Sequence, residues 1–233
     1  MGHTRLRLAL VAGLFVFGFS FLFAQTTLEL GVLGGITNYL GDLQQTHFEV
    51  RTVRPAAGGY ARLQFGNVVS LRAHALRGAL WASDANYSDL MIQKRGMSFS
   101  GELREAGLQL ELAFMHFGAE RIRRAAPYLL LGWNRYEFVP ESSADNSTLP
   151  VDLPAATFTL RDWSVPFGLG FHFLPHPRVN IGFEVSWRKT FTDELDGYAP
   201  VGSANDWYFA GTLQVGYRFG KVEKRRSDAL TKS

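Results

Sequence analysis

The stretch WSVPFGLGFHF, residues 163–173, decides the fold because an apolar side chain stands at every second position. The apolar residues are Trp163, Val165, Phe167, Leu169, Phe171 and Phe173, and Ser, Pro, Gly and His stand between them. Successive side chains of a β-strand point to opposite faces, so this period predicts a strand with one apolar face. Its length of about 10 residues is what a tilted strand needs to cross a bilayer.

The same period recurs along the chain. It is clear over residues 179–188 and 207–219, and weaker over 28–36, 58–65, 68–81, 108–115 and from 129 onward. The connections between these segments alternate in length. Those at 66–67, 118–126 and 174–178 are short, and those at 37–57, 82–97, 139–162 and 189–206 are long. Outer-membrane barrels have short periplasmic turns and long extracellular loops. The sequence therefore predicts an all-β fold, an eight-stranded antiparallel transmembrane β-barrel of the outer membrane, of OmpA or OmpX size.

A soluble secreted barrel, such as a lipocalin, is the alternative, since it also alternates but turns its apolar face inward. The apolar parity here is dense in Phe, Trp and Leu, with aromatic residues near the strand ends, as a membrane girdle requires. The final segment also ends in an aromatic residue, in GYRF at 216–219. These features favour the membrane barrel, with Phe167, Phe171, Phe183, Val185, Leu213 and Val215 facing lipid.

The opposite parity is rich in glycine and carries a few charges of both signs. They are Glu29, Arg62, Arg72, Glu111, Glu184 and Arg218. We expect a cramped lumen in which these charges pair with one another, because an unpaired buried charge is costly. Arg77 interrupts the apolar parity, so we place it at or above the membrane surface, or after a bulge.

Residues 1–24 resemble a secretory signal, because Arg5 and Arg7 precede an apolar run that ends before Gln25. An uncleaved anchor is the alternative, but the run is short for a spanning helix of about 20 residues. We therefore divide the chain into a signal peptide (1–24), an outer-membrane barrel (25–220) and a basic tail (221–233). An even number of strands would place this tail in the periplasm.

Composition excludes several classes of function. The sequence pI is near 9.3, but residues 25–220 contain 17 basic and 19 acidic residues, which is no nucleic-acid-binding face. The chain has no cysteine, which excludes a disulfide framework, a thiolate metal site and a lipid anchor on cysteine.

Two groups of residues are candidates for chemistry. The acids of DELDGY (193–198) lack the alternate spacing of a calcium loop, so we interpret them as solvated loop carboxylates. His74 and His172 fall on the inward parity, with Ser70 on the same face as His74, and outer-membrane lipases and acyltransferases use such residues. No triad spacing is visible. We therefore expect a non-enzymatic protein with no catalytic residue, cofactor or metal, and a lipid-modifying enzyme is the alternative.

Four segments together resemble the PorG-like family of small outer-membrane barrels. They are LGVLGGITNYLGDL (30–43), SFSGELREAGLQLELAFMHF (98–117), WSVPFGLGFHF (163–173) and FEVSWRKTFTDELDGY (183–198). The matching residues, whose role is unknown, include Asn38, Tyr39, Gly41, Asp42, Glu111, Glu184, Arg188, Asp193 and Asp196. The resemblance implies an accessory or anchoring component of the type IX secretion machinery. Its implied partners are outer-membrane lipids, a periplasmic ring lipoprotein and the partner of that lipoprotein. A general structural or adhesive barrel is the alternative.

Overall fold

The computed structural model describes residues 26–40, 50–66, 68–83, 97–114, 125–144, 159–192 and 206–219. They form eight strands: β1 (Thr26–Leu40), β2 (Arg54–Phe65), β3 (Val69–Ser83), β4 (Met97–Ala113), β5 (Ala125–Ala144), β6 (Leu160–His176), β7 (Val179–Thr190) and β8 (Trp207–Phe219). One short 3-10 helix, η2 (Val50–Thr52), precedes β2. No helix in the described part of the chain is both long and apolar enough to span a membrane.

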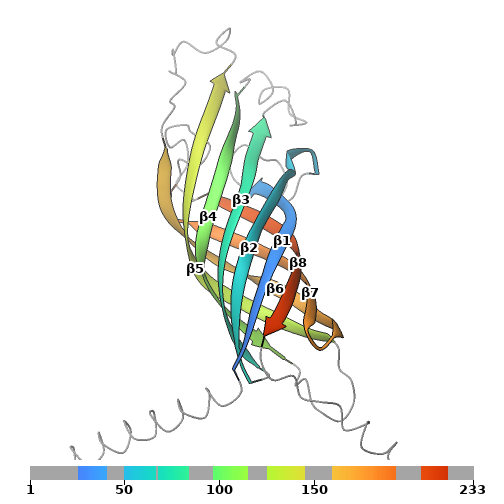
Figure 1. Cartoon of the computed structure of the whole chain (residues 1–233). Helices are drawn as coiled ribbons and strands as arrows, with labels where there is room; N and C mark the ends of the chain where they lie inside the picture. Colours follow the sequence, from blue (N-terminus) through green and yellow to red (C-terminus); the bar gives the residue numbers. More distant parts are fainter. Residues whose placement is uncertain are drawn as a thin grey trace, which may run out of the picture.

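The eight strands form a closed barrel in chain order, and the pairing of β1 with β8 closes it (Figure 1). Every neighbouring pair is antiparallel. This confirms the predicted eight-stranded antiparallel barrel. Thr26 pairs with Phe65 and Leu28 with Phe219, so β1 begins and β8 ends at the same end of the barrel. The short turns after β2 and β6 also lie there, which makes it the periplasmic end.

The turn between β2 and β3 depends on Gly66. Its φ of 61° lies in the left-handed region, which glycine adopts without steric cost.

The two faces of the strands differ as the sequence pattern predicts. Phe183 is 50% exposed and Leu213 61% exposed on the outside, while Glu184 is 2% exposed on the inside. The predicted lipid-facing residues Phe167, Phe171 and Val215 are also exposed, and Val185 is partly exposed. Exposure of such a continuous apolar surface to water is unfavourable, so the barrel exterior is the lipid-facing side.

An aromatic girdle lies toward the extracellular end of this exterior. Trp133 packs 5.9 Å from Trp163, measured between ring centroids, and Trp187 packs 5.7 Å from Phe209. Phe167 contacts both Trp187 and Trp207 at 6.2 and 5.7 Å. Such rings favour the membrane–water interface, because one side of the ring meets lipid and the other meets water.

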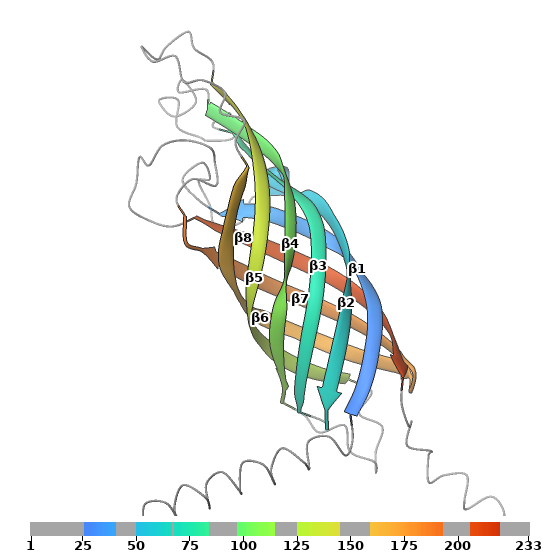
Figure 2. The ribbon, with the colours of Figure 1, turned by 60° about the vertical axis from the view of Figure 1, so that its left-hand side comes forward.

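The predicted strand ends are wrong at the extracellular end. The connections predicted at 37–57, 82–97, 139–162 and 189–206 are partly strand, because β1 continues to Leu40, β2 begins at Arg54 and β5 reaches Ala144. In Figures 1 and 2, β4 and β5 reach farthest from the periplasmic end. Above the membrane the outer face turns polar, so the apolar period stops while the hydrogen-bonded ladder continues. His176, predicted as a turn residue, is the last residue of β6.

The predicted signal peptide (1–24) and basic tail (221–233) lie outside the described residues.

Candidate functional site

The lumen contains a network of buried charges that comes from six of the eight strands, β1 to β4, β7 and β8. An eight-stranded barrel encloses a space just wide enough for side chains, so inward charges from opposite strands meet. The network joins four glutamates, Glu29, Glu105, Glu111 and Glu184, with four arginines, Arg62, Arg72, Arg188 and Arg218. Seven of these eight residues are at most 3% exposed, the exception being Arg218. This confirms the predicted internal pairing of Glu111, Glu184 and Arg218.

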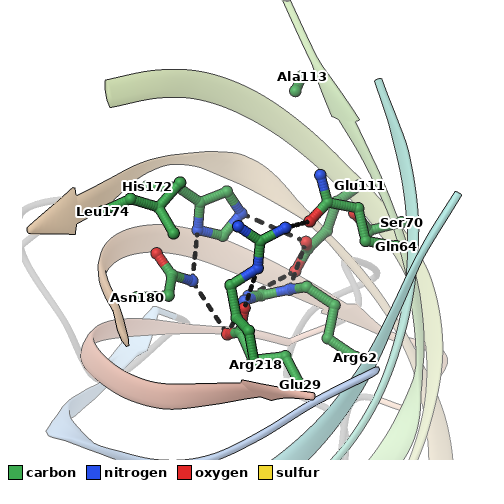
Figure 3. Close-up of a pocket in the computed structure, with 10 residues that line it drawn as sticks. All are labelled: Glu29, Arg62, Gln64, Ser70, Glu111, Ala113, His172, Leu174, Asn180 and Arg218. Atoms are coloured by element: carbon green, nitrogen blue, oxygen red, sulfur yellow. Dashed lines mark hydrogen bonds and ion pairs between the residues drawn. The ribbon is translucent and has the colours of Figure 1, made fainter. Parts of the chain in front are cut away.

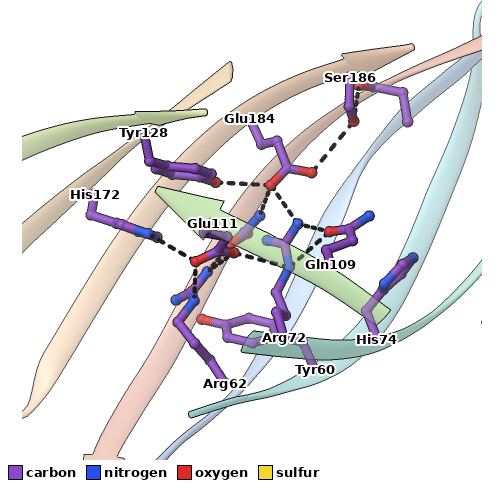
Figure 4. A network of polar contacts seen from close by, with 12 residues as sticks. Tyr60, Arg62, Arg72, His74, Gln109, Glu111, Tyr128, His172, Glu184 and Ser186 are labelled. Atoms are coloured by element: carbon purple, nitrogen blue, oxygen red, sulfur yellow. Dashed lines mark hydrogen bonds and ion pairs between the residues drawn. The ribbon is translucent and has the colours of Figure 1, made fainter. Parts of the chain in front are cut away.

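Arg72 and Glu184 are at the centre of the network (Figure 4). Arg72 Nη2 lies 2.5 Å from Glu184 Oε2, and Arg72 Nε lies 3.2 Å from Glu111 Oε1. Arg62 contacts Glu111 on the periplasmic side, with 2.8 Å between Nε and Oε2. Gln214 completes the layer by donating to Glu184 at 3.1 Å and accepting from Arg62 at 2.9 Å. Each buried charge therefore has an opposite charge and a hydrogen bond, which offsets much of its desolvation.

Two tyrosines fit into this layer because glycines stand opposite them. Tyr128 donates to Glu184 at 2.8 Å, and Tyr60 donates to Glu29 at 2.7 Å. A Cβ at Gly170 would lie 2.2 Å from Tyr128 Cζ, and a Cβ at Gly31 would lie 2.5 Å from Tyr60 Cζ. The inward glycines therefore provide the room that the tyrosine rings occupy.

The periplasmic mouth of the lumen is also filled (Figure 3). Glu29 accepts from Arg62 at 2.5 Å and from Asn180 at 2.9 Å, and Arg218 donates to Gln64 at 2.8 Å. The cavity among these residues has a volume of about 20 Å³. That is room for about one water molecule, since a water needs roughly 10–15 Å³ by the same measure.

Toward the extracellular end, a second polar layer surrounds Glu105. Arg188 Nε lies 3.0 Å from Glu105 Oε2, His74 Nε2 lies 2.8 Å from Glu105 Oε1, and Tyr208 donates a short hydrogen bond to the same carboxylate. An apolar cluster covers this layer. Its buried members are Tyr39, Leu80, Ala82, Phe99, Leu103, Tyr136, Phe138 and Tyr208. The lumen is thus closed from the periplasmic mouth to this cluster.

The structure brings some of the family-motif residues together and leaves others apart. Glu111, Glu184 and Arg188 belong to the luminal network. Asn38 and Tyr39 are buried at the extracellular end of β1, where Asn38 accepts from Thr52 at 3.0 Å and Tyr39 donates to Asp206 at 2.6 Å. Gly41, Asp42, Asp193 and Asp196 lie outside the described residues, as does Glu194. The function of the motif therefore stays a prediction.

The histidines do not form a catalytic arrangement with Ser70. His74 binds Glu105, but no hydroxyl reaches its Nδ1 among the described residues, and a triad needs the nucleophile on that second nitrogen. Ser70 stands four residues away on β3, about 13 Å along the strand. His172 Nδ1 accepts from Asn180 at 3.2 Å, so its lone pair is already used. Within the described ranges no three His, Asp or Glu residues cluster as metal ligands.

Several residues of the network were not predicted from the sequence. Tyr60, Tyr128, Tyr208 and Gln109 all lie on the inward parity, which is the signal that could have found them. An aromatic ring on a parity otherwise made of glycine and charges indicates a side chain that spans the lumen.

A closed eight-stranded antiparallel barrel with an apolar exterior, an aromatic girdle and a polar interior defines the class: this is an outer-membrane β-barrel protein. Residues 7–224 match the family described as "Domain of unknown function (DUF6089)", and the chain belongs to that family.

The chain is also similar to several solved structures. A major outer membrane protein from Thermus thermophilus superposes with a TM-score of 0.50 at 12% identity, covering 84% of this chain and 100% of the other. The N-terminal β-barrel domain of Pseudomonas aeruginosa OprF gives a TM-score of 0.47 at 13% identity, with coverages of 84% and 100%. P. aeruginosa OprG gives 0.47 at 12% identity, with coverages of 85% and 97%. Among curated proteins none matches this chain. At these identities the likeness concerns the fold alone.

Proposed function

We propose that this protein is a non-enzymatic, non-conducting anchor in the outer membrane, and that it serves as an accessory component of the type IX secretion machinery. The observation that carries the proposal is the filled lumen. Arg72, Glu111 and Glu184 block the centre, and the aromatic cluster around Phe99 closes the extracellular half. A barrel filled in this way is suited to hold its loops and ends in fixed positions at the two membrane surfaces.

The non-enzymatic part of the proposal is supported by the state of the polar side chains. Active sites also contain histidines buried against a carboxylate, but such a histidine faces a nucleophile and an open cleft. Here the cavity beside His172 has a volume of about 20 Å³, which holds a water and no acyl chain. Replacing both His74 and His172 should leave lipid A acylation unchanged, and a loss of acylation would favour the lipid-modifying enzyme instead.

The secretion role rests on the resemblance to the PorG-like family, including Glu111, Glu184 and Arg188. Both described ends of the barrel, Thr26 and Phe219, lie at the periplasmic end. We propose that the basic tail that follows Phe219 reaches an acidic periplasmic partner, a ring lipoprotein or its own partner, by charge attraction.

Recovery of the native complex tests this role. Full-length tagged protein, extracted from outer membranes in mild detergent, should bring down the ring lipoprotein, and deleting the gene should reduce secretion of cargo proteins. Truncation after Gly220 should weaken recovery while heat-modifiable gel mobility shows an intact barrel. K224Q/R225Q/R226Q in the full chain should weaken it similarly, whereas Arg178→Gln in the periplasmic β6–β7 turn should not. Normal cargo secretion and no ring protein in the pull-down would favour a general structural or adhesive barrel.

Conductance tests the filled lumen independently of any partner. The purified protein in planar bilayers should show no steady ion conductance above the lipid baseline. A stable open channel would contradict the non-conducting anchor.

A further inference from the structure

Basic side chains stand just above the apolar outer surface on five consecutive strands. On each of β3 to β7, the first charged residue that points outward above the apolar surface is basic. These residues are Arg77, Arg104, Arg135, Arg161 and Lys189, called here the basic belt, and all five are exposed. On β5, for example, Leu129, Leu131 and Trp133 face lipid, and Arg135 is the next outward residue. The belt therefore follows the extracellular border of the membrane.

The sequence predicts that Arg77 lies at or above the membrane surface, or after a bulge. The pairing of β3 with β2 and β4 is regular around it. Its side chain is 71% exposed. It therefore lies above the apolar surface without a bulge.

Within the belt, two positive charges come close together at Arg77 and Arg104. They are directly opposite on β3 and β4, an arrangement that is unfavourable for like charges. Glu102 offsets the repulsion by binding both, at 2.8 Å to Arg77 and 2.5 Å to Arg104. Hydrogen bonds from Arg104, then Arg77, lower the pKa of Glu102, so the carboxylate stays ionised at neutral pH. One carboxylate between two guanidinium groups leaves a net positive charge at this point.

The other belt residues contact either an aromatic ring of the girdle or a neighbouring acid. The contacts with rings do not neutralise the positive charge. Arg135 Cζ lies 5.0 Å from the ring centroid of Trp163, and Lys189 Nζ lies 5.7 Å from that of Trp207. Such cation–π contacts orient a basic group over an interfacial ring. Arg161 pairs with Glu137 at 3.3 Å between Nε and Oε2.

The charge on the outer surface is mainly positive and is concentrated at the extracellular border of β3 to β7. The five basic residues of the belt and the two acidic residues that pair with them, Glu102 and Glu137, together have a net charge of +3. Among the described residues of β1, β2 and β8 no charged side chain points outward within the apolar surface, and none does on the periplasmic half of β3 to β7. A feature needed only for solubility would have no reason to prefer one sign and one border.

We propose that the basic belt binds the phosphate groups of the phosphorylated glycolipid that forms the outer leaflet, lipopolysaccharide. The phosphates of this lipid lie at the border between the acyl chains and water, which is the level of the belt. Guanidinium groups bind phosphate oxygens in a bidentate manner, and Arg77 and Arg104 offer two such groups about 5 Å apart at their Cβ atoms. The inference is independent of the secretion role, because it concerns the lipid-facing surface alone.

Binding of lipid A by the full-length protein in uncharged detergent tests the proposal. The probe is diphosphorylated lipid A, compared with lipid A from which both phosphates have been removed. The wild type should prefer the phosphorylated form, and added salt should weaken that preference. R77Q/R104Q/R161Q should bind diphosphorylated lipid A on the order of 100-fold more weakly, at about fivefold for each charge near an anionic lipid surface. The matched control R178Q/K224Q/R225Q has the same change in net charge outside the belt and should bind like the wild type.

A second variant should strengthen the binding of lipid A instead of weakening it. Glu102→Gln removes the carboxylate that occupies both guanidinium groups, so binding of diphosphorylated lipid A should strengthen about fivefold. Heat-modifiable mobility confirms that each variant is folded. Inorganic phosphate at millimolar concentration should not displace the lipid, because the site requires a phosphate held at the membrane border. Equal binding of the dephosphorylated lipid, unchanged binding in the triple variant, or an equal loss in the control would each overturn the proposal.

Discussion

Replacing Arg72 by methionine removes the central cation of the lumen while keeping an unbranched side chain. Arg72 is 2% exposed and lies 2.5 Å from Glu184 and 3.2 Å from Glu111. Without it Glu184 keeps only the hydrogen bonds of neutral donors, such as Tyr128 at 2.8 Å. Breaking a buried ion pair by removing one partner typically costs about 3–5 kcal/mol, because the remaining charge stays buried and unpaired. We expect Arg72→Met to lower the free energy of unfolding by about that amount.

Two further variants separate this cost from general disruption. Arg72→Met combined with Glu184→Gln removes both charges, so the double variant should be more stable than the single variant. Arg77→Met changes the same residue type on the same strand, but its side chain is 71% exposed and should cost at most about 1 kcal/mol. Unfolding by guanidinium in lipid vesicles, followed through the five tryptophans, gives these free energies. The reasoning fails if Arg72→Met is within about 1 kcal/mol of the wild type, or if Arg77→Met costs as much.

Three other changes are measured in the same assay. Gly170→Ala should cost about 1–3 kcal/mol because its Cβ would lie 2.2 Å from Tyr128, whereas Gly34→Ala, whose Cβ meets nothing within 4 Å, should be nearly neutral; equal effects would contradict the packing described. Phe183→Arg on the lipid-facing side should cost about 2–4 kcal/mol, and a neutral result would mean that Phe183 does not face lipid. Because the pKa of Glu102 is lowered in the folded protein, its contribution to stability is present above its unfolded pKa and lost as the pH falls through the folded pKa. The difference between wild type and Glu102→Gln should therefore shrink in acid, and a difference that grows on acidification would refute the bridge.

The assignment of faces could be predicted from the sequence because lipid and lumen impose opposite polarity on neighbouring residues. Phe183 and Glu184 are adjacent, and the first is 50% exposed while the second is 2% exposed. Alternation alone separates them, since side chains at successive positions of a strand cannot share a face. The strand count followed from the same signal, because each crossing of the bilayer repeats it.

The contacts across the lumen could not be predicted, because they depend on register and on the curvature of the closed sheet. Arg72 and Glu184 are 112 positions apart in sequence, and Arg62 and Gln214 are 152 apart. The sequence indicates that such charges face inward, but it does not indicate which ones meet. The match of Gly170 with the Tyr128 ring is likewise invisible until the two strands are placed side by side.

The strand ends were mispredicted for a related reason. Above the membrane, the outer surface meets water, so Glu137 and Arg161 replace the apolar residues while the strands continue to pair. Hydrophobic periodicity reports the environment of a strand, and at this border the environment changes before the strand ends.

A charged lumen also fixes the register of the barrel in a way that an apolar lumen would not. If β3 slipped by one residue, Arg72 and His74 would turn toward lipid and Leu71 would turn inward. An arginine facing the middle of the bilayer costs about 2–4 kcal/mol, and the buried carboxylates would lose their partner as well. With leucine in place of the luminal charges both faces would be apolar, and the slipped and native registers would differ little in free energy. The strands would then also be uniformly apolar in transit to the membrane, whereas the present chain has a mean hydropathy of −0.04. The ion pairs that fill the lumen are therefore also what makes one arrangement of these strands much more stable than its neighbours.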